Sequence, residues 1–295
     1  MSALRAVADG LAAQTGARCS PLPERAVSGG SINQCYLWHG ETRPLFVKVA
    51  DRAQFAMLEA EAAGLRELAA AQALRVPQVL AIGCAEQSAF LALEWIESGA
   101  AGRGAEHRLG ERLAAQHRVT ARAFGWHRDN TIGRTPQLNG WLSDWVEFVR
   151  ERRLRPQLAL AARNGFGDLL EAVGERLLES VADLLAGRRP QPSLLHGDLW
   201  GGNWFADSHG EPVVFDPAVY FGDHEADLAM TRLFGGFGRA FYQAYEAEAP
   251  LAAGADTRFE LYNLYHVLNH ANLFGGGYAR QARAMLDRLL SQVRG

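Results

Sequence analysis

The sequence predicts an α+β protein with a small β-rich N-terminal lobe and a larger, mainly helical C-terminal lobe. Strand-like runs dominate the first third of the chain, whereas most of the remainder has helical periodicity. The 295 residues, of which 48% are hydrophobic, are enough for two lobes with buried cores. We place the division before the Gly- and Ala-rich link near residues 96–104, so that the expected domains are 1–95 and 96–295.

The N-terminal lobe is expected to contain a short helix, a β-hairpin, a long helix and two strands. They are expected over residues 4–14, 37–49, 52–72, 76–83 and 89–96. The hairpin has polar residues and Gly40 between two β-rich runs. The long helix is predicted by apolar residues that recur at helical spacing: Phe55, Leu58, Ala62, Leu65 and Leu68.

The C-terminal lobe is expected to contain helices over 106–123, 141–163, 168–186, 223–247 and 257–274. Two short apolar runs between them, SLLHGD and PVVFDP, are broken by Asp and Pro, and Asp216 is expected to end a strand. Trp141, Trp145 and Phe148 recur at helical spacing, which favours a place in the core.

Composition excludes several broad classes. A net charge of −3 and a pI near 6.3 do not favour nucleic acid or anionic membranes as partners. Cys19, Cys35 and Cys84 are scattered and form no CxxC pair, so a disulfide framework is not expected. The N-terminus lacks a signal-peptide pattern, and no apolar run is long enough to span a membrane. We therefore expect a soluble, cytoplasmic protein.

Two carboxylates and one amide are expected on neighbouring loops. His196-Gly197-Asp198 is followed by four residues and Asn203, and Asp216 lies in Phe-Asp-Pro. Protein kinases use the pattern H-R-D-x-x-x-x-N and a later Asp, in which one Asp faces the substrate hydroxyl while Asn and the second Asp bind metal. Mg²⁺ needs few protein ligands when phosphates supply the rest. Each motif alone is also compatible with an ordinary Asx turn.

The kinase interpretation requires a strand lysine paired with a helix glutamate. Lys48, in LFVKVA, is the only Lys in the chain, and every other basic residue except His is Arg. A solvent-exposed strand lysine is the alternative. Glu61 shares the apolar stripe of Leu58 and Leu65, so we expect it to pair with Lys48; Glu59 is the alternative partner.

Two further segments are candidates for nucleotide contacts. SGGSIN contains Gly29, Gly30 and Ser31, whose backbone N–H groups are suited to phosphates. The pattern is weak, and ordinary turn chemistry also explains it. LALEWIES follows the last strand of the lobe, where adenine is expected to bond to the backbone of Glu94 and Ile96.

Other interpretations remain open at this point. His266 and His270, four residues apart on an expected helix, are compatible with zinc, although HExxH and a third ligand are missing. Asp227 is expected to cap its helix or to brace the HGD loop from beneath. A non-catalytic nucleotide-binding protein would have lost the Lys, Asp or Asn of the motifs, and none is lost here.

HGDLWGGN, followed by FDPAVYFGDHEADLAMTRLFGGF, closely resembles the fructosamine-3-kinase (ketosamine-3-kinase) family. That family belongs to the aminoglycoside-phosphotransferase and choline-kinase group, which has a bilobal protein-kinase-like fold. Further resembling segments are GGSINQCYLW, FVKV, MLEAEAAGL, RVPQVL, FGWHRDNTIG, TPQLNGW and ERRLRPQL. The resemblance covers nearly the whole chain from about residue 24. HGDxxxxN alone indicates only the broad group, whereas the Trp200 context and the DPAVYFG…EADLAM run narrow it to the family.

The resemblance implies an ATP-dependent kinase that phosphorylates O3 of ketosamines, which are sugars joined to amines by glycation. The 3-phosphate decomposes and frees the amine, which links the family to protein deglycation. By position, Asp198 would be the catalytic base, Asn203 and Asp216 the Mg²⁺ ligands, and Trp200 a stacking platform for substrate. Lys48 would hold the α- and β-phosphates of ATP, braced by Glu61.

The resemblance leaves several properties undecided. The preferred sugar (ribulosamine, erythrulosamine or fructosamine), a free or protein-bound substrate, and a monomer or homodimer all remain open. A kinase with another acceptor, such as an aminoglycoside or choline, is the alternative. Several members of the family have a redox-sensitive Cys directly after the Gly-Gly pair. Ser31 stands there in this chain and Cys35 lies four residues further on, so we expect no redox switch by that route.

Overall fold

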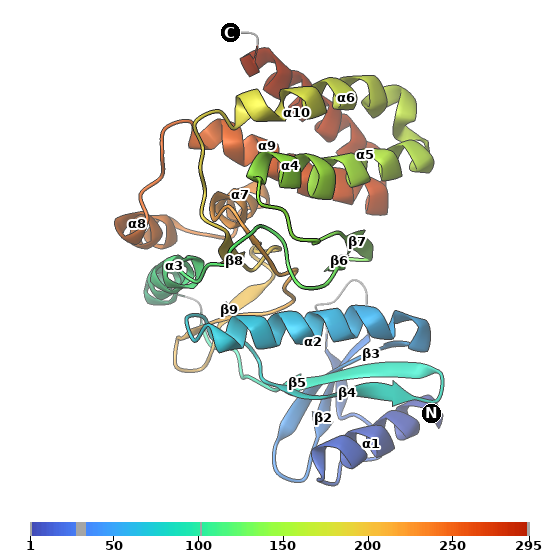
Figure 1. Cartoon of the computed structure of the whole chain (residues 1–295). Helices are drawn as coiled ribbons and strands as arrows, with labels where there is room; N and C mark the ends of the chain where they lie inside the picture. The colour runs from blue at the N-terminus through green and yellow to red at the C-terminus, as the bar shows by residue number, and fades with distance from the viewer. Residues whose placement is uncertain (1, 28–33, 101, 294–295) are drawn as a thin grey trace. The chain divides into compact units, whose positions relative to one another are not determined.

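The computed structural model describes residues 2–27, 34–100 and 102–293, and the chain divides into two compact units (Figure 1). The first unit comprises Met1–Ala105 and Trp204–Pro217, and the second comprises Glu106–Asn203 and Ala218–Gly295. This division differs from the expected one in two respects. The first unit continues past residue 95 to Ala105, and the segment 204–217 returns to it from the second half of the sequence.

A five-stranded antiparallel sheet forms the centre of the first unit, in the order β1-β2-β3-β5-β4. The strands are β1 Arg25–Val27, β2 Gln34–His39, β3 Pro44–Asp51, β4 Val79–Ala85 and β5 Ser88–Glu94. The predicted hairpin is confirmed as β2 and β3, which pair from Gln34 with Val49 to His39 with Pro44.

Helices α1 (Ser2–Thr15) and α2 (Phe55–Ala70) lie on opposite sides of this sheet (Figure 1). Side chains alternate along β3, so Val47 and Val49 join the core beneath α1, whereas Lys48 points to the α2 side. Helix α1 approaches the sheet closely, since a Cβ on Gly10 would lie 2.8 Å from the Phe90 ring. The alternation of side chains thus places Lys48 on the α2 face, between the apolar neighbours Val47 and Val49.

A short hairpin of β9 (Trp204–Ala206) and β10 (Pro212–Val214) explains why the late segment belongs to the first unit. Val213 forms a parallel bridge with Arg75, and the Arg75 guanidinium contacts the buried Asp207 carboxylate. Gly99 N–H also donates to Ala206 O at 2.8 Å. These contacts join residues distant in sequence, which periodicity within one segment does not reveal.

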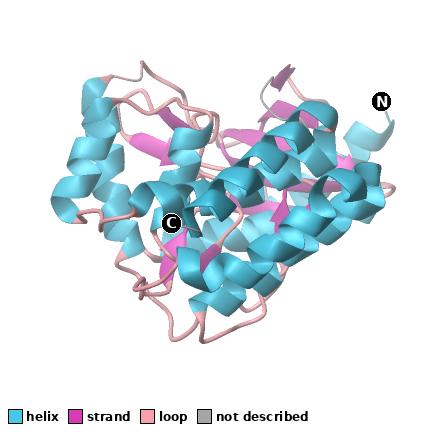
Figure 2. Cartoon of the chain, turned by 90° about the horizontal axis from the view of Figure 1, so that it is seen from above, coloured by secondary structure: helices cyan, strands magenta, loops and turns pink. Residues whose placement is uncertain are grey.

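The second unit is built mainly from helices, which Figure 2 distinguishes from the short strands. The helices are α3 Arg103–His117, α4 Trp145–Phe148, α5 Arg155–Ala161, α6 Gly167–Leu184, α7 Glu225–Leu233, α8 Arg239–Glu248, α9 Ala255–Phe274 and α10 Gly276–Val293. Helix α3 begins at the end of the first unit. Helix α9 is buried along most of its length and packs against α5, α7 and α10. Two short pairs, β6 (Asn130–Ile132) with β7 (Thr135–Gln137) and β8 (Ser193–Leu195) with β11 (Tyr220–Gly222), complete the unit.

Two expectations about the helices were wrong in detail, and one helix was missed. Trp141 is 45% exposed, because the helix begins only at Trp145, where the Asp144 carboxylate accepts the Glu147 N–H. The helix expected over 223–247 is two helices, α7 and α8, separated by a loop with Gly235 and Gly236 at positive φ. Helix α10 was not expected.

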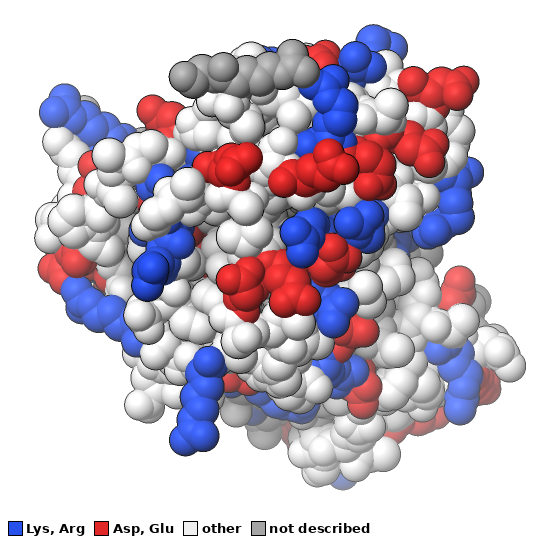
Figure 3. Space-filling view, turned by 45° about the horizontal axis from the view of Figure 1, so that its top comes forward, with Lys and Arg blue, Asp and Glu red and all other residues white. Residues whose placement is uncertain are grey.

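Charged residues of both signs are interspersed on the face shown in Figure 3. Within the described residues, no helix combines the length and the apolar character that crossing a membrane requires. Cys19, Cys35 and Cys84 are not joined in disulfides.

Candidate active site

The loop after β8 contains His196, Gly197 and Asp198. Gly197 has φ of +82°, and a Cβ at this position would lie 2.1 Å from Ala218 O. Both the left-handed backbone and the missing space require glycine here. The backbone therefore turns sharply between the buried His196 and the half-exposed Asp198.

Asn203 folds back onto Asp198. Its Nδ2 donates to Asp198 O at 2.8 Å and to the Asp198 carboxylate at 3.3 Å. The backbone between them is tied by Trp200 N–H to Asp198 O at 3.2 Å and by Asn203 N–H to Trp200 O at 2.9 Å. With the amide nitrogen directed at Asp198, the Asn203 amide oxygen is the atom with the chemistry to ligate a hard cation.

Asp227 in α7 braces this loop from beneath, which confirms one of its two expected roles. The carboxylate accepts the N–H groups of His196 and Gly197, each at 2.8 Å, and contacts His117 Nε2 at 3.2 Å. Burial raises the pKa of Asp227, but the hydrogen bonds from His117 and Gly197 outweigh burial, and the pKa lies below its ordinary value. A buried carboxylate that stays ionised thus fixes the HGD backbone.

A set of buried amides holds the segment that passes beside the loop. Asn130 Nδ2 donates to Val219 O at 2.8 Å, and Gln137 Nε2 donates to Ala218 O at 3.0 Å. Ala218 N–H in turn donates to His196 O at 2.9 Å. The sequence interpretation missed these residues, although they lie in FGWHRDNTIG and TPQLNGW, two segments used only for the family resemblance.

Arg153 anchors the same amide network and was also missed. It lies on a π-helical turn, Val149–Leu154, and donates to Asn139 Oδ1 at 2.8 Å and to Leu138 O at 2.6 Å. Asn139 then donates to Asn130 Oδ1 at 2.7 Å. Its guanidinium stacks on aromatic rings: 4.0 Å from the Tyr220 centroid, 4.6 Å from Phe148 and 5.5 Å from Tyr265. Hydrogen bonds to neutral oxygens and ring faces therefore accommodate this buried cation.

In the first unit, Lys48 contacts two carboxylates. Its Nζ lies 2.7 Å from Glu61 Oε1 and 2.5 Å from Asp216 Oδ1, and the residue is 5% exposed. Glu61 is therefore the glutamate that pairs with Lys48, as its place on the apolar stripe predicted. Burial lowers the pKa of Lys48, but Asp216 and Glu61 outweigh burial and hold the pKa above its ordinary value. Burial raises the pKa of Glu61 to about 7, against the opposing charge of Lys48.

Asp216 follows β10 and has φ of +55°, in the left-handed region. Asp is among the few residues other than Gly that adopt this conformation. One carboxylate oxygen faces Lys48, and the side chain is partly exposed. A carboxylate of this kind and the amide oxygen of Asn203 are hard oxygen donors, the type that Mg²⁺ prefers.

Of the other residues expected to contact the nucleotide, the structure describes only some. Gly29, Gly30 and Ser31 lie outside the described residues. Glu94 ends β5, and its N–H donates to Gln78 O at 2.9 Å, so this donor is already engaged within the protein. Ile96 follows the strand and is half-buried.

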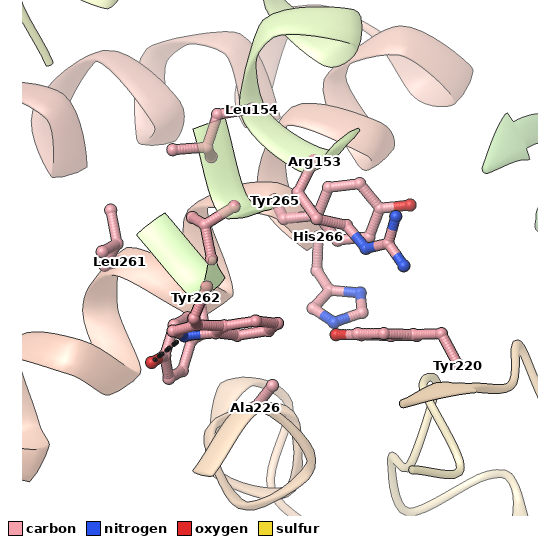
Figure 4. A pocket seen from close by; sticks show the side chains of 10 residues that line it. Arg153, Leu154, Tyr220, Ala226, Leu261, Tyr262, Tyr265 and His266 are labelled. Atoms are coloured by element: carbon pink, nitrogen blue, oxygen red, sulfur yellow. Dashed lines mark hydrogen bonds between the residues drawn. The ribbon is translucent and has the colours of Figure 1, made fainter. Parts of the chain in front are cut away.

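A separate cavity of about 20 Å³ lies in the helical core of the second unit (Figure 4). Its size and partly polar lining suit one water molecule. His266 lines this cavity beside Tyr220 and Arg153, and burial lowers the pKa of His266 to about 3. His270 Nδ1 bonds to His266 O at 2.8 Å, and the described residues contain no group of three His, Cys, Asp or Glu side chains suited to a metal ion. His266 thus belongs to the core packing, whereas His270 is the more exposed of the two.

Gly197→Ala is expected to reduce turnover at least about 100-fold, because the new Cβ displaces either Ala218 or Asp198. Steady-state kinetics measure this. Gly187→Ala is the matched control, since Gly187 also has positive φ but no atom within 4 Å of its Cβ position. Equal loss in both variants would show that backbone strain, and not the close approach to Ala218, is the cause.

Comparison with known proteins finds relatives along nearly the whole chain. Residues 3–292 match the model of a family described as fructosamine kinase. A relative in Synechocystis sp., named as a probable ketoamine kinase, is 48% identical over 267 residues, or 90% of each chain. A chloroplastic protein-ribulosamine 3-kinase of Arabidopsis thaliana is 41% identical over 273 residues, which are 91% of this chain and 83% of that protein.

Solved structures show the same fold. A structure assigned to a fructosamine-3-kinase of Haemophilus somnus has a TM-score of 0.86 at 30% identity, covering 96% of each chain. An aminoglycoside phosphotransferase solved with ADP and hygromycin B has a TM-score of 0.63 at 18% identity, over 98% of this chain and 99% of that chain. At that identity the likeness shows the fold alone, and it confirms the predicted α+β, protein-kinase-like class.

Proposed function

Because the chain belongs to the fructosamine kinase family, we propose that this kinase transfers the γ-phosphate of ATP to the O3 hydroxyl of ketosamines. Relatives named for ketoamines and ribulosamines support this acceptor class. The observation that carries the proposal is the loop in which Asn203 folds onto Asp198 while Asp227 holds the backbone from beneath.

The proposed mechanism assigns one task to each residue. Asp198 orients the O3 hydroxyl and accepts its proton as the hydroxyl attacks the γ-phosphorus in line. Lys48, kept protonated by its two carboxylates, binds the α- and β-phosphates, and Glu61 positions it. Trp200 offers a ring face to the acceptor.

Asn203 and Asp216 are the proposed Mg²⁺ ligands. Their amide and carboxylate oxygens fit the preference of this ion for hard donors. When bound, Mg²⁺ would neutralise charge on the β- and γ-phosphates. The nucleotide is proposed to contact the backbone of Gly29, Gly30 and Ser31 through its phosphates, and that of Glu94 and Ile96 through adenine.

The proposal extends to the fate of the product and to the setting in which the enzyme acts. The unstable 3-phosphate would decompose and free the amine, so the enzyme would deglycate small amines or proteins. Cysteines without disulfides favour a reducing, cytoplasmic setting. The enzyme would act as a monomer or homodimer.

An acceptor panel tests the proposal. We expect Mg²⁺-dependent ATP consumption with ribulose-lysine and fructose-lysine, a 3-phosphate detectable by ³¹P NMR, and release of free lysine. Hygromycin B and choline should give only background rates. ATP consumption confined to an aminoglycoside or choline would keep the kinase and overturn the ketosamine acceptor.

A further inference from the structure

Several aromatic side chains of the second unit form a continuous row that starts in the catalytic loop. This aromatic row consists of Trp200, Phe234, His270, Phe274 and Tyr278. Ring centroids lie 6.5 Å apart between Trp200 and Phe234, 4.9 Å between Phe234 and His270, and 5.6 Å between His270 and Phe274. The row therefore leads from two residues beyond Asp198 to the junction of α9 and α10.

Three of the five side chains in the row are exposed to solvent. Trp200, Phe234 and Phe274 are 41%, 40% and 63% exposed, and with Trp141 they are the exposed large hydrophobic side chains of the described residues. Tyr278 stands 6.3 Å from Phe274 and 5.1 Å from His270, so the outer end is a platform of two six-membered rings. Contiguous apolar exposure of this kind is typical of a binding surface.

The chemistry of a ketosamine matches the order of the rings. Three carbon atoms separate O3 from the amine nitrogen, which is a secondary ammonium at neutral pH. A cation of this kind is attracted to aromatic faces, and in a glycated lysine the ammonium continues into a four-carbon apolar stem. With O3 at Asp198, the sugar would lie beside Trp200, the first ring of the row, and the ammonium and its alkyl chain would continue toward the other rings.

We propose that the outer row, Phe274 and Tyr278, binds the alkyl chain on the amine nitrogen of the acceptor. The enzyme then prefers ketosamines of long alkyl amines, such as the lysine side chain, over those of short polar amines. This inference rests on the proposed ketosamine acceptor and adds the part of the substrate that the Asp198 loop does not contact.

Two ketosamines of the same sugar, one made with hexylamine and one with ethanolamine, test the inference. For the native protein we expect kcat/KM to favour the hexylamine compound by about tenfold, which corresponds to about 1.4 kcal/mol. Phe274→Ala should reduce this preference to less than roughly threefold by raising KM, with kcat little changed, because a remote contact contributes uniform binding. The ethanolamine compound should be phosphorylated equally well by both proteins.

Two variants serve as controls. Phe274→Leu keeps an apolar side chain and should keep most of the preference. Trp141→Ala removes an exposed aromatic ring outside the row, which lies beside Phe221, and should leave the preference unchanged. Equal kcat/KM for the two ketosamines, or a preference unaffected by Phe274→Ala, would overturn the role of the row while the ketosamine kinase stands. Phosphorylation of neither compound would overturn both.

Discussion

Asp198→Asn is expected to lower kcat for ketosamine phosphorylation by about 10²- to 10⁴-fold. Asparagine has nearly the same size, and the Asn203 hydrogen bond to the backbone oxygen of residue 198 does not depend on the side chain. An amide has no basic site for the O3 proton, so only proton acceptance and hydroxyl orientation are lost. ATP affinity should therefore stay within a few-fold of the native value, as measured by calorimetry beside steady-state kinetics.

Asp168→Asn provides the matched control, since it makes the same chemical change at an exposed position in the first turn of α6. It should leave kcat unchanged. If Asp198→Asn kept kcat within a factor of ten, the carboxylate would not be the proton acceptor. A parallel loss of ATP affinity would instead place Asp198 among the nucleotide contacts.

Helices and strands could be predicted from the sequence where the pattern of apolar residues within one segment was sufficient. The β2–β3 hairpin and α2 are of this kind, because alternation and helical spacing each reflect a single buried face. The hairpin of β9 and β10 is different: it belongs to the first unit through Arg75 and Asp207, which are far apart in the chain. Side-chain pairing over such distances leaves no periodic trace in the sequence.

In the candidate active site, too, residues within short motifs could be predicted, whereas contacts between distant segments could not. Spacing alone indicated Asp198, Asn203 and Asp216, and a shared apolar stripe indicated Glu61. The network through Arg153 and the buried amides could not be derived, because Asn and Gln in short loops look like turn residues. Only the structure reveals that their partners are backbone oxygens beside the HGD loop.

Lys48→Met is expected to decrease both catalysis and stability. Loss of a phosphate-binding cation should reduce kcat/KM for ATP by roughly 10²-fold or more. Two carboxylates that now share one ammonium would lose their partner, and removing one member of a buried ion pair costs about 3–5 kcal/mol in a closed core. Because Asp216 is partly exposed, we expect about 2–4 kcal/mol here, measured by urea unfolding of the nucleotide-free protein.

The pH dependence of this loss identifies its cause. Burial already raises the pKa of Glu61 to about 7, and without Lys48 the charge of Asp216 raises it further. A group whose pKa is raised by folding contributes stability at low pH and loses that contribution as pH rises through the folded-state pKa. In the native protein this loss is complete above about pH 7, but in the variant it continues to higher pH. The destabilisation should therefore be smaller at pH 6 than at pH 9.

Two further variants separate charge from geometry. Arg66→Met removes an exposed cation from α2 and should change neither stability nor its pH dependence. Lys48→Arg keeps the charge and should restore much of the stability at pH 9 but little of the activity, because a planar guanidinium cannot replace a compact ammonium between two carboxylates and phosphates. Full activity in Lys48→Arg would mean that a positive charge alone is sufficient at this position. Catalysis would then not explain why the chain has Lys here and Arg at every other Lys or Arg position.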